Sequence, residues 1–251
     1  MDLYGLIGKS LKHSFSGEYF GDKFEKEQID AIYHLFEMED VPDLHEFLEK
    51  NPRLKGLNVT IPYKRMLIQQ MDDLSPVAET VGGINVVDVC RRNGKAKLVG
   101  HNTDVFGIEQ SLKPLIKKRE QLRALILGTG GGAHAVAYVL RKWGIYYYYV
   151  SRTPKKLIEL NYTWLTPKLM QEYELIINTT PLGMHPNEDT YPDILYDKLT
   201  ENHILFDLVY NPEETLFLKK GKEKGAKTKN GLEMLYVQAE ESWKIWNKGK
   251  K

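Results

Sequence analysis

In the segment Gly56–Met66, GLNVTIPYKRM, two side chains that could act on a small polar molecule, Thr60 and Lys64, lie on either side of Pro62. Proline has no N–H for a sheet ladder and fixes its own φ, so we expect the strand that precedes Pro62 to end there. Thr60 could hydrogen-bond a ligand at this strand end, and the Lys64 ammonium could give up a proton. Two other interpretations fit the same letters: an ordinary short buried strand, or an N-glycosylation site at Asn58.

The composition argues against glycosylation and against several classes of partner. The chain has one cysteine, which excludes an internal disulfide, and its start, MDLYGLIGKSLKH, lacks the basic and long apolar regions of a secretory signal. We therefore expect a cytoplasmic location. The 35 Lys and Arg nearly balance the 34 Asp and Glu, so neither nucleic acid nor a membrane is expected as the main partner. The histidines and Cys90 show no metal-ligand spacing, so no metal is expected.

A glycine-rich segment follows a short apolar run and leads into an amphipathic one. The run RALIL is followed by Gly128-Thr129-Gly130-Gly131-Gly132-Ala133 and then by HAVAYVLRKWG. Glycines permit a tight turn and a close approach of backbone to a pyrophosphate, whose charge the helix N-terminus favours. This strand–loop–helix context predicts a dinucleotide site, and the alternative is a glycine-rich turn without a ligand.

The end of the next expected strand indicates which dinucleotide binds. Ser151-Arg152-Thr153 stands where a site for NAD usually has an acidic residue for the ribose hydroxyls. Arg152 could instead pair with a 2′-phosphate and stack on the adenine, and Lys156 could add a second positive charge. The sequence therefore predicts NADP rather than NAD. The alternative is that both cations are ordinary solvated surface residues.

These candidate residues need strands to present them, and short apolar runs alternating with longer amphipathic ones predict β-α units on mostly parallel sheets. In the first part of the chain we expect strands at 3–8, 31–38, 57–61, 84–91 and 95–100 and helices at 16–26, 41–51 and 63–71. Asn93-Gly94 predicts a hairpin between the last two strands, because both residues tolerate positive φ. We expect this hairpin to form an antiparallel edge of the first sheet.

A second β-α series begins near residue 123. Its strands are expected at 124–128, 146–151, 175–180 and 204–209; a helix at 103–118 precedes them, and the last helix, 231–246, is expected to pack back on the first domain. The predicted fold is an α/β protein of two domains. The first is a substrate domain with a mixed sheet, 1–103 plus 233–251, and the second is a Rossmann-type NADP-binding domain, 104–232.

A set of motifs spread over the chain resembles one family. In chain order they are Gly8, His13-Ser14-Phe15-Ser16, NVTIPYK (58–64), Asn85, HNTD (101–104), the glycine loop, SRT (151–153), INTTPLGM (177–184), DLVYNPEETLFL (207–218) and NGLEMLYVQA (230–239). Their order and spacing are similar to those of shikimate dehydrogenases, and the resemblance covers essentially the whole chain. It implies NADP-dependent, reversible reduction of 3-dehydroshikimate to shikimate, a step toward chorismate and the aromatic amino acids.

The resemblance also implies roles for individual residues. Ser14 and Ser16 resemble ligands of the substrate carboxylate, and Lys64 and Asp104 resemble a catalytic pair that also contacts the substrate. The other implied substrate contacts are Thr60, Asn85, Tyr210 and Gln238. The implied cofactor contacts are Gly128, Thr129, Gly130, Gly131, Gly132, Ala133, Ser151, Arg152, Thr153, Lys156, Asn178, Thr179, Leu208 and Gly231, of which the last two match positions near the nicotinamide. Ser151 stands where the family commonly has asparagine.

The residue types are consistent with this chemistry. Hydride addition to a ketone requires a proton for the developing alkoxide, and the Lys64 ammonium can donate it. Asp104 nearby would favour the charged lysine, so the pair suits reduction better than oxidation, and oxidation should be favoured at higher pH. Taken singly, Ser14 and Ser16 would more often be a helix N-cap pair, and Thr60 an ordinary β-branched strand residue.

Several other functions remain open from the residues. Within enzymes these are a quinate/shikimate dehydrogenase that uses NAD and an oxidoreductase of the methylenetetrahydrofolate type. From another class, the chain could be a binding module for NADP that has lost catalysis. Arg152 argues against NAD, the serine pair argues for a carboxylated polyol, and the presence of both Lys64 and Asp104 argues against a loss of catalysis. Monomer and homodimer are both compatible with the sequence.

Overall fold

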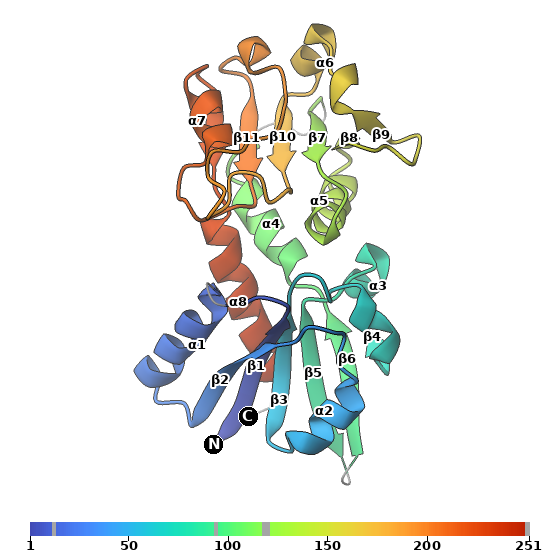
Figure 1. Cartoon of the computed structure of the whole chain (residues 1–251), viewed down its shortest axis with the longest axis vertical. Helices are drawn as coiled ribbons and strands as arrows, with labels where there is room; N and C mark the ends of the chain where they lie inside the picture. The colour runs from blue at the N-terminus through green and yellow to red at the C-terminus, as the bar shows by residue number, and fades with distance from the viewer. Residues whose placement is uncertain (12–13, 93–94, 117–120, 249–251) are drawn as a thin grey trace. The chain divides into compact units, whose positions relative to one another are not determined.

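The computed structural model describes residues 1–11, 14–92, 95–116 and 121–248 and is drawn in Figure 1. The chain divides into two compact units. Unit 1 consists of Met1–Thr103 and Gln238–Lys251, and unit 2 consists of Asp104–Val237. Each unit has its own six-stranded sheet.

The sheet of unit 1 is mixed, as predicted. Its strands are β1 (Asp2–Gly8), β2 (Ala31–Glu37), β3 (Leu54–Val59), β4 (Asp73–Leu74), β5 (Val86–Arg92) and β6 (Lys95–His101), in the order β2-β1-β3-β5-β6-β4. β1 lies parallel to β2 and to β3. β5 lies antiparallel to β3 and to β6. The carboxyl ends of β1 and β3 therefore meet at one edge of the sheet.

The predicted hairpin is confirmed in its pairing but not in its position. β5 and β6 pair antiparallel up to Arg92 and Lys95, and Asn93 and Gly94 lie outside the described residues. The prediction that this hairpin forms the edge is wrong, because β4 pairs with β6 and takes the edge. A strand of two residues is too short to show a period-2 pattern, which explains why the sequence did not predict β4.

The α-helices α1 (Phe15–Lys26), α2 (Leu44–Lys50) and α3 (Pro76–Val81) of unit 1 begin at side-chain caps, and the 3₁₀ helix η1 (Met66–Gln70) has no side-chain cap. α3 was not predicted. Ser14, Asp43 and Ser75 each accept a hydrogen bond from a backbone N–H in the first turn of α1, α2 and α3 respectively.

The predicted helix at 63–71 is only partly formed. Turns occupy 61–65, and regular structure is limited to the five residues of η1. Tyr63 and Leu67 are both buried, which produced the helical spacing in the sequence. The chain must reverse directly after Pro62, however, and a hydrogen bond from the N–H of Tyr63 to the carbonyl of Thr60 closes a tight turn there. The turn takes the place of the first helical residues.

The last helix, α8 (Leu232–Trp246), packs its C-terminal part on the sheet of unit 1, as predicted. Trp246 is buried, and its Nε1 donates a hydrogen bond to the carbonyl of Val87 at 3.1 Å. The ring lies against Gly56, where an added Cβ would stand 2.2 Å from Trp246 Nε1. Tyr4, Phe20 and Trp246 belong to one core cluster. Glycine at position 56 thus permits the helix to approach β3.

The sheet of unit 2 is entirely parallel. Its strands are β7 (Arg123–Leu127), β8 (Tyr146–Ser151), β9 (Glu159–Asn161), β10 (Leu175–Asn178), β11 (Ile204–Asp207) and β12 (Lys227–Lys229). The order β12-β11-β10-β7-β8-β9 corresponds to the 3-2-1-4-5-6 order of the dinucleotide-binding fold. Figure 1 shows β7, β10 and β11 side by side and pointing the same way. The predicted Rossmann-type fold is confirmed, and β9 and β12, which were not predicted, are its third and sixth strands.

The helices of unit 2 are α4 (Asp104–Leu112), α5 (Gly131–Lys142), α6 (Pro167–Glu172), α7 (Leu216–Lys222) and the 3₁₀ helices η2 (Tyr162–Trp164) and η3 (Tyr196–Lys198). The helix predicted at 103–118 ends at Leu112, because the residue before a proline disfavours helical geometry and Pro114 follows closely. β10 and β11 are buried along their whole length, as expected for strands that are covered on both faces.

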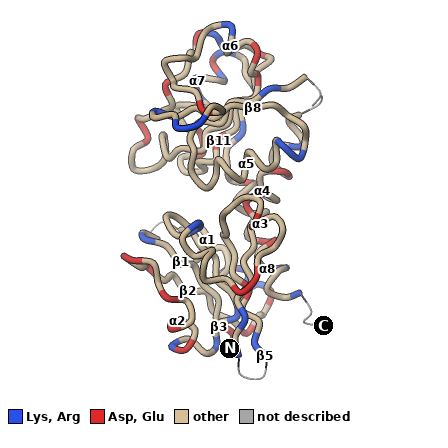
Figure 2. The backbone as a smooth tube through the Cα atoms, turned by 90° about the vertical axis from the view of Figure 1, so that its right-hand side faces the viewer, with Lys and Arg blue, Asp and Glu red and all other residues tan. Residues whose placement is uncertain are grey.

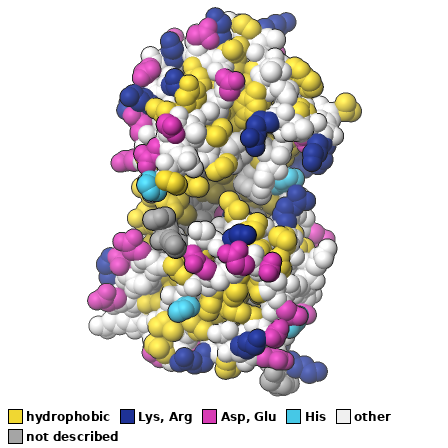
Figure 3. All heavy atoms as spheres, viewed as in Figure 1, with side chains coloured by type: hydrophobic (Ala, Val, Ile, Leu, Met, Phe, Trp, Pro, Cys, Tyr) yellow, Lys and Arg dark blue, Asp and Glu magenta, His cyan; other side chains and the backbone are white. Residues whose placement is uncertain are grey.

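The surface carries charges of both signs in alternation. Figures 2 and 3 show lysines and arginines interspersed with aspartates and glutamates along both units. Within the described residues, no helix is long and apolar enough to cross a membrane. The same residues contain no group of three or more His, Cys, Asp or Glu side chains that could hold a metal ion.

Candidate functional site

Four of the predicted substrate residues, Ser14, Ser16, Thr60 and Lys64, follow the carboxyl ends of β1 and β3. Thr60 comes directly after β3, and its N–H donates to the carbonyl of Ile7 at the end of β1 at 2.9 Å. Gly8 leaves room for it, because an added Cβ there would stand 2.5 Å from Thr60 Cγ2. Ser14 follows the same end of β1 by a short connection, in which its N–H donates to the carbonyl of Leu11. His13, which precedes it, lies outside the described residues.

Ser14 and Ser16 form the N-terminus of α1. The Ser14 Oγ accepts a hydrogen bond from the Ser16 N–H at 3.3 Å, so the N-cap interpretation holds in the structure. Ser16 is buried, and its side chain hydrogen-bonds the hydroxyl of Tyr33. Burial raises the pKa of Tyr33, so its hydroxyl stays protonated and can donate. A helix N-terminus also attracts a carboxylate, and the two roles of the serine pair are compatible.

Asn85 is the centre of a buried group of polar side chains. Its Oδ1 accepts from the N–H of Thr103 at 2.7 Å, and its Nδ2 donates to Thr103 Oγ1 at 3.0 Å and to Gln238 Oε1 at 3.4 Å. The carbonyl of Asn85 accepts from the N–H of Val59 at 2.9 Å. Next to it, the N–H of Ile84 donates to the carbonyl of Lys64 at 2.8 Å. The structure thus brings Asn85 together with Gln238 and with the backbone on both sides of Pro62.

A second set of buried side chains supports this group and was not predicted as part of the site. Asn58 accepts at Oδ1 from the Tyr33 hydroxyl at 2.7 Å and donates from Nδ2 to Ser242 Oγ at 3.1 Å and to the carbonyl of Asn85 at 3.3 Å. Ser242 also donates to the carbonyl of Gln238 at 2.8 Å. The missed signal was a polar residue inside an apolar run, which requires buried partners.

Asp104 and Tyr210, the remaining predicted substrate residues, belong to unit 2. Asp104 is the first residue of α4 and is buried. Tyr210 follows β11 by three residues and is half-buried. Both therefore stand near element ends, where a side chain can reach a ligand.

The glycine loop of unit 2 has the backbone that a pyrophosphate site requires. Gly128 has φ +105°, and an added Cβ would stand 2.8 Å from Thr179 Oγ1. An added Cβ at Gly132 would stand 2.9 Å from Leu208 Cδ2. Gly130 is the N-cap of α5, whose first turn has no acidic residue. The loop lies at the switch point between β7 and β10, where open α/β sheets bind ligands, and the residues present fit a dinucleotide.

The predicted adenosine-binding residues follow β8. The Ser151 Oγ accepts from the N–H of Thr153 at 3.2 Å, and the carbonyl of Arg152 accepts from Asn161 Nδ2 at 3.0 Å. These bonds order the loop and leave the side chains of Arg152 and Lys156 exposed. Burial raises the pKa of Tyr162 to about 12, and the nearby Arg152 guanidinium lowers it. The Arg152 guanidinium therefore lies near Tyr162.

The remaining predicted cofactor residues, of which Leu208 and Gly231 were predicted near the nicotinamide, lie close to the ends of β10 and β11. An added Cβ at Gly231 would stand 2.3 Å from the carbonyl oxygen of Leu208, so only glycine fits there. The Thr179 Oγ1 donates to the carbonyl of Leu127 at 2.7 Å. Asn178 is buried and donates from Nδ2 to Asp207 Oδ1 at 2.9 Å. Asp207 was not predicted as part of the site.

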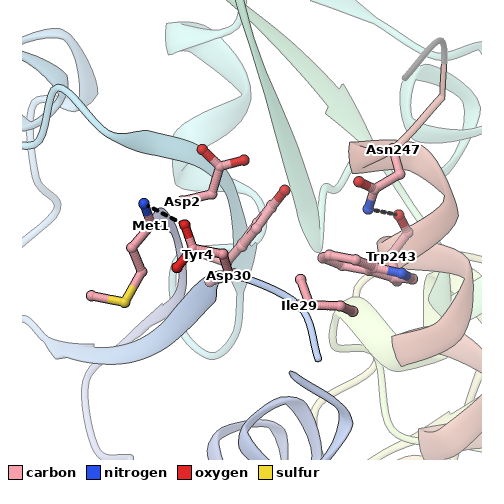
Figure 4. Close-up of a pocket in the computed structure, with 8 residues that line it drawn as sticks. Met1, Asp2, Tyr4, Ile29, Asp30, Trp243 and Asn247 are labelled. Atoms are coloured by element: carbon pink, nitrogen blue, oxygen red, sulfur yellow. Dashed lines mark hydrogen bonds and ion pairs between the residues drawn. The ribbon is translucent and has the colours of Figure 1, made fainter. Parts of the chain in front are cut away.

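A separate hollow of about 460 Å³ lies in unit 1 at the start of β1. Tyr4, Ile29 and Trp243 form its apolar walls, and Asp2 and Asp30 lie at its side (Figure 4). None of the predicted site residues lines it, and it stands at the opposite end of β1 from Gly8.

Comparison with known proteins identifies the family. A family model described as the shikimate dehydrogenase substrate binding domain matches residues 6–87. The shikimate dehydrogenase (NADP(+)) of Aquifex aeolicus is 37% identical over 254 residues, which cover 98% of this chain and 91% of that protein. The chain belongs to the shikimate dehydrogenase family. The predicted resemblance is thereby confirmed.

Solved structures of the family have the same fold. The crystal structure of shikimate dehydrogenase 1 from Peptoclostridium difficile is 35% identical, with a TM-score of 0.85, over 98% of this chain and 92% of that chain. Shikimate 5-dehydrogenase from Listeria monocytogenes, solved in complex with shikimate and NAD, is 28% identical, with a TM-score of 0.85 and the same coverage. The predicted two-domain fold of a shikimate dehydrogenase is confirmed.

Proposed function

We propose that this protein catalyses the reversible, NADPH-dependent reduction of 3-dehydroshikimate to shikimate, a step toward chorismate and the aromatic amino acids. The observation that carries the proposal is the 37% identity over 98% of the chain to a shikimate dehydrogenase (NADP(+)). The buried amides of unit 1 and the glycine loop of unit 2 supply the two kinds of site that this reaction needs.

Unit 1 is assigned as the substrate domain. The Ser14 and Ser16 hydroxyls, at the start of α1, would bind the substrate carboxylate, and the helix N-terminus would add to this. Thr60, Asn85 and Gln238 would bind the ring hydroxyls, and Tyr210 would contribute from unit 2. Short hydroxyl and amide side chains suit a polyhydroxy acid, because they can donate and accept within a small space.

Unit 2 is assigned as the NADP domain. The loop from Gly128 to Ala133 would hold the pyrophosphate, and Arg152 would pair with the 2′-phosphate. Ser151, Thr153 and Lys156 would complete the adenosine end, and Asn178, Thr179, Leu208 and Gly231 would border the nicotinamide. When bound, NADPH supplies the hydride that reduces the carbonyl carbon and leaves as NADP⁺.

Lys64 is assigned as the proton donor. As the carbonyl carbon gains the hydride, its oxygen becomes an alkoxide and takes a proton from the Lys64 ammonium. Asp104 would favour the charged form of the lysine. In the reverse direction the neutral lysine accepts the hydroxyl proton, so oxidation is favoured as the pH rises.

The test is turnover by the purified protein, followed as loss of NADPH absorbance with 3-dehydroshikimate and, separately, with 3-dehydroquinate. We expect oxidation of NADPH with dehydroshikimate and much less with dehydroquinate. Tight NADPH binding without turnover on either substrate would favour a binding module, and equal turnover on both would favour a quinate/shikimate dehydrogenase.

NAD is a second candidate cofactor, because the Listeria relative was solved with NAD. The same assay with NADH decides between them, and Arg152 leads us to expect a preference for NADPH. Whether the protein is a monomer or a homodimer, and its cytoplasmic location, stay predictions from the sequence.

A further inference from the structure

A carboxylate that the proposed chemistry does not use is buried at the end of β11. Asp207 has 0% of its surface exposed. Its Oδ1 accepts hydrogen bonds from Asn178 Nδ2 at 2.9 Å and from the Val209 N–H at 3.0 Å. Its Oδ2 accepts from Thr215 Oγ1 at 2.6 Å. All three of these donors are neutral, so they stabilise the ionised carboxylate by hydrogen bonds but do not neutralise its negative charge.

Each donor belongs to a different segment. Asn178 ends β10, Val209 lies between Leu208 and Tyr210, and Thr215 is the N-cap of α7. The Asp207 carboxylate therefore joins the ends of β10, β11 and the connection to α7.

The segments joined in this way carry residues assigned to the ligands. Asn178 Oδ1 accepts from Thr180 N at 3.0 Å and from Thr180 Oγ1 at 2.6 Å, which orders 178–180. The carbonyl of Asn178 accepts from the N–H of Leu208 at 2.9 Å. A change at Asp207 would therefore move Asn178, Thr179 and Leu208, which are assigned to the cofactor, together with Tyr210.

Protonation of Asp207 would change the hydrogen bonds that its carboxylate accepts. Burial raises the pKa of Asp207 to about 7, against the lowering effect of the three hydrogen bonds. On neighbouring elements, the Tyr196 phenol of η3 has its pKa raised by burial and by the charges of Asp207 and Asp193, so it remains neutral. Lys220 of α7 lies over the Tyr196 ring, 5.6 Å from its centroid. A protonated Asp207 accepts less strongly, and at Oδ2 it would displace the Thr215 hydrogen.

We propose that Asp207 is a positioning residue, which holds 178–180 and 208–210 in the arrangement that the nicotinamide and the substrate require. The proposal rests on the proposed function for the identity of both ligands. It predicts that the adenosine end of the cofactor site, after β8, is independent of Asp207. Loss of the carboxylate should therefore affect reduction and leave the binding of an adenosine fragment unchanged.

The experiment compares Asp207→Asn with the wild type in kcat, in KM for dehydroshikimate and in the Kd of 2′,5′-ADP, a fragment that lacks the nicotinamide. We expect kcat/KM to fall about 10- to 100-fold, because small displacements at a reacting centre have effects of this size. The Kd of 2′,5′-ADP should stay the same. A folding defect would instead weaken both.

Thr215 provides an independent pair of variants. Thr215→Val removes the hydroxyl at nearly constant volume and should lower kcat/KM in the same direction, whereas Thr215→Ser keeps the hydroxyl and should retain most of the wild-type value. In the wild type, kcat/KM should also fall as the pH drops through about 7, and Asp207→Asn should remove this fall while the pH dependence of 2′,5′-ADP binding is unchanged.

The outcomes separate the inference from the proposed function. If the wild type is active, and Asp207→Asn has the same kcat/KM and the same fall of kcat/KM at acid pH, the inference alone is overturned. A wild type without turnover on dehydroshikimate overturns the proposed function. In that case the Kd of NADPH tests the inference. Asp207→Asn should raise the Kd of NADPH more than the Kd of 2′,5′-ADP, and an equal change in the two constants overturns the inference.

Discussion

At the scale of single residues, the structure places Lys64 through its backbone. The carbonyl of Lys64 accepts from the N–H of Ile84 at 2.8 Å, so the turn after β3 is fixed to the residue before Asn85. This attachment involves no atom of the lysine side chain. The side chain can therefore be shortened without loss of the turn, and Lys64 can be tested apart from the fold.

We expect Lys64→Ala to lower kcat by about 10²- to 10⁴-fold, the usual effect of a lost general acid, with a much smaller change in KM for dehydroshikimate. Steady-state kinetics of reduction measures both. Lys55→Ala removes a partly exposed lysine from β3, whose ammonium lies 3.9 Å from Asp2, and serves as the control with unchanged kcat. Near wild-type turnover by Lys64→Ala would show that another group donates the proton.

Arg152 is expected to set the choice of cofactor through a single ion pair with the 2′-phosphate. We expect Arg152→Ala to raise KM for NADPH about 10- to 100-fold, because charged hydrogen bonds to a phosphate contribute about 1.5 to 3 kcal/mol. KM for NADH should hardly change, since NADH has no 2′-phosphate. Arg123→Ala removes another partly exposed arginine of unit 2 and should leave both constants unchanged. An equal loss for both cofactors would make Arg152 an adenine-stacking residue and contradict its phosphate role.

At the scale of elements, two helices of unit 1 begin in the same way and only one is assigned to a ligand. Ser14 caps α1 and Asp43 caps α2, and each side chain accepts from backbone N–H groups of the first turn. Loss of an N-cap usually costs about 1 kcal/mol of stability. The pair therefore separates the structural role of a cap from the proposed binding of the carboxylate.

We expect Ser14→Ala and Asp43→Ala to lower the free energy of unfolding by similar amounts, about 0.5 to 2 kcal/mol each. Only Ser14→Ala should also raise KM for dehydroshikimate, because only Ser14 is assigned to the carboxylate. Denaturant titration and kinetics on the same samples measure the two effects. If both variants raised KM alike, the serine would act through helix stability.

At the scale of the whole molecule, the sequence predicted what local patterns encode. The strands of unit 2 are continuous apolar runs, and the glycine loop stands between a strand and a helix, so the Rossmann-type sheet followed from short segments. Strands of two or three residues, such as β4 and β12, have no pattern long enough to detect. They form because their backbone groups can hydrogen-bond to the longer neighbouring strands β6 and β11.

The sequence analysis assigned ligand contacts but not the side chains that support them. Ser14, Thr60, Asn85 and Gln238 were assigned through a family resemblance. Asn58 and Ser242, which hydrogen-bond each other at 3.1 Å, are 184 positions apart in the chain. No periodicity or motif joins residues so distant, and their pairing depends on how α8 packs on β3.

The two units should respond to pH in opposite directions. In unit 1, burial lowers the pKa of His101 from 6.5, so the unfolded chain binds a proton more readily, and this contribution to stability is lost as the pH falls below about 6.5. In unit 2, burial raises the pKa of Asp207 from 3.8 to about 7. Here the folded chain binds the proton more readily, so stability is lost as the pH rises from about 4 to 7.

We therefore expect His101→Gln to reduce the loss of stability at acid pH. We expect Asp207→Asn to reduce the loss of stability between pH 4 and 7. The pKa change of Asp207 from 3.8 to about 7 corresponds to at most about 4 kcal/mol of stability. Calorimetry of the wild type and both variants across this range measures it. Above pH 7 the ionised Asp207 would hold the nicotinamide-side segments at a cost in stability, so the pH that favours its positioning role is the one that weakens unit 2. An Asp207→Asn variant whose stability falls with rising pH as steeply as that of the wild type would place the titration on another group.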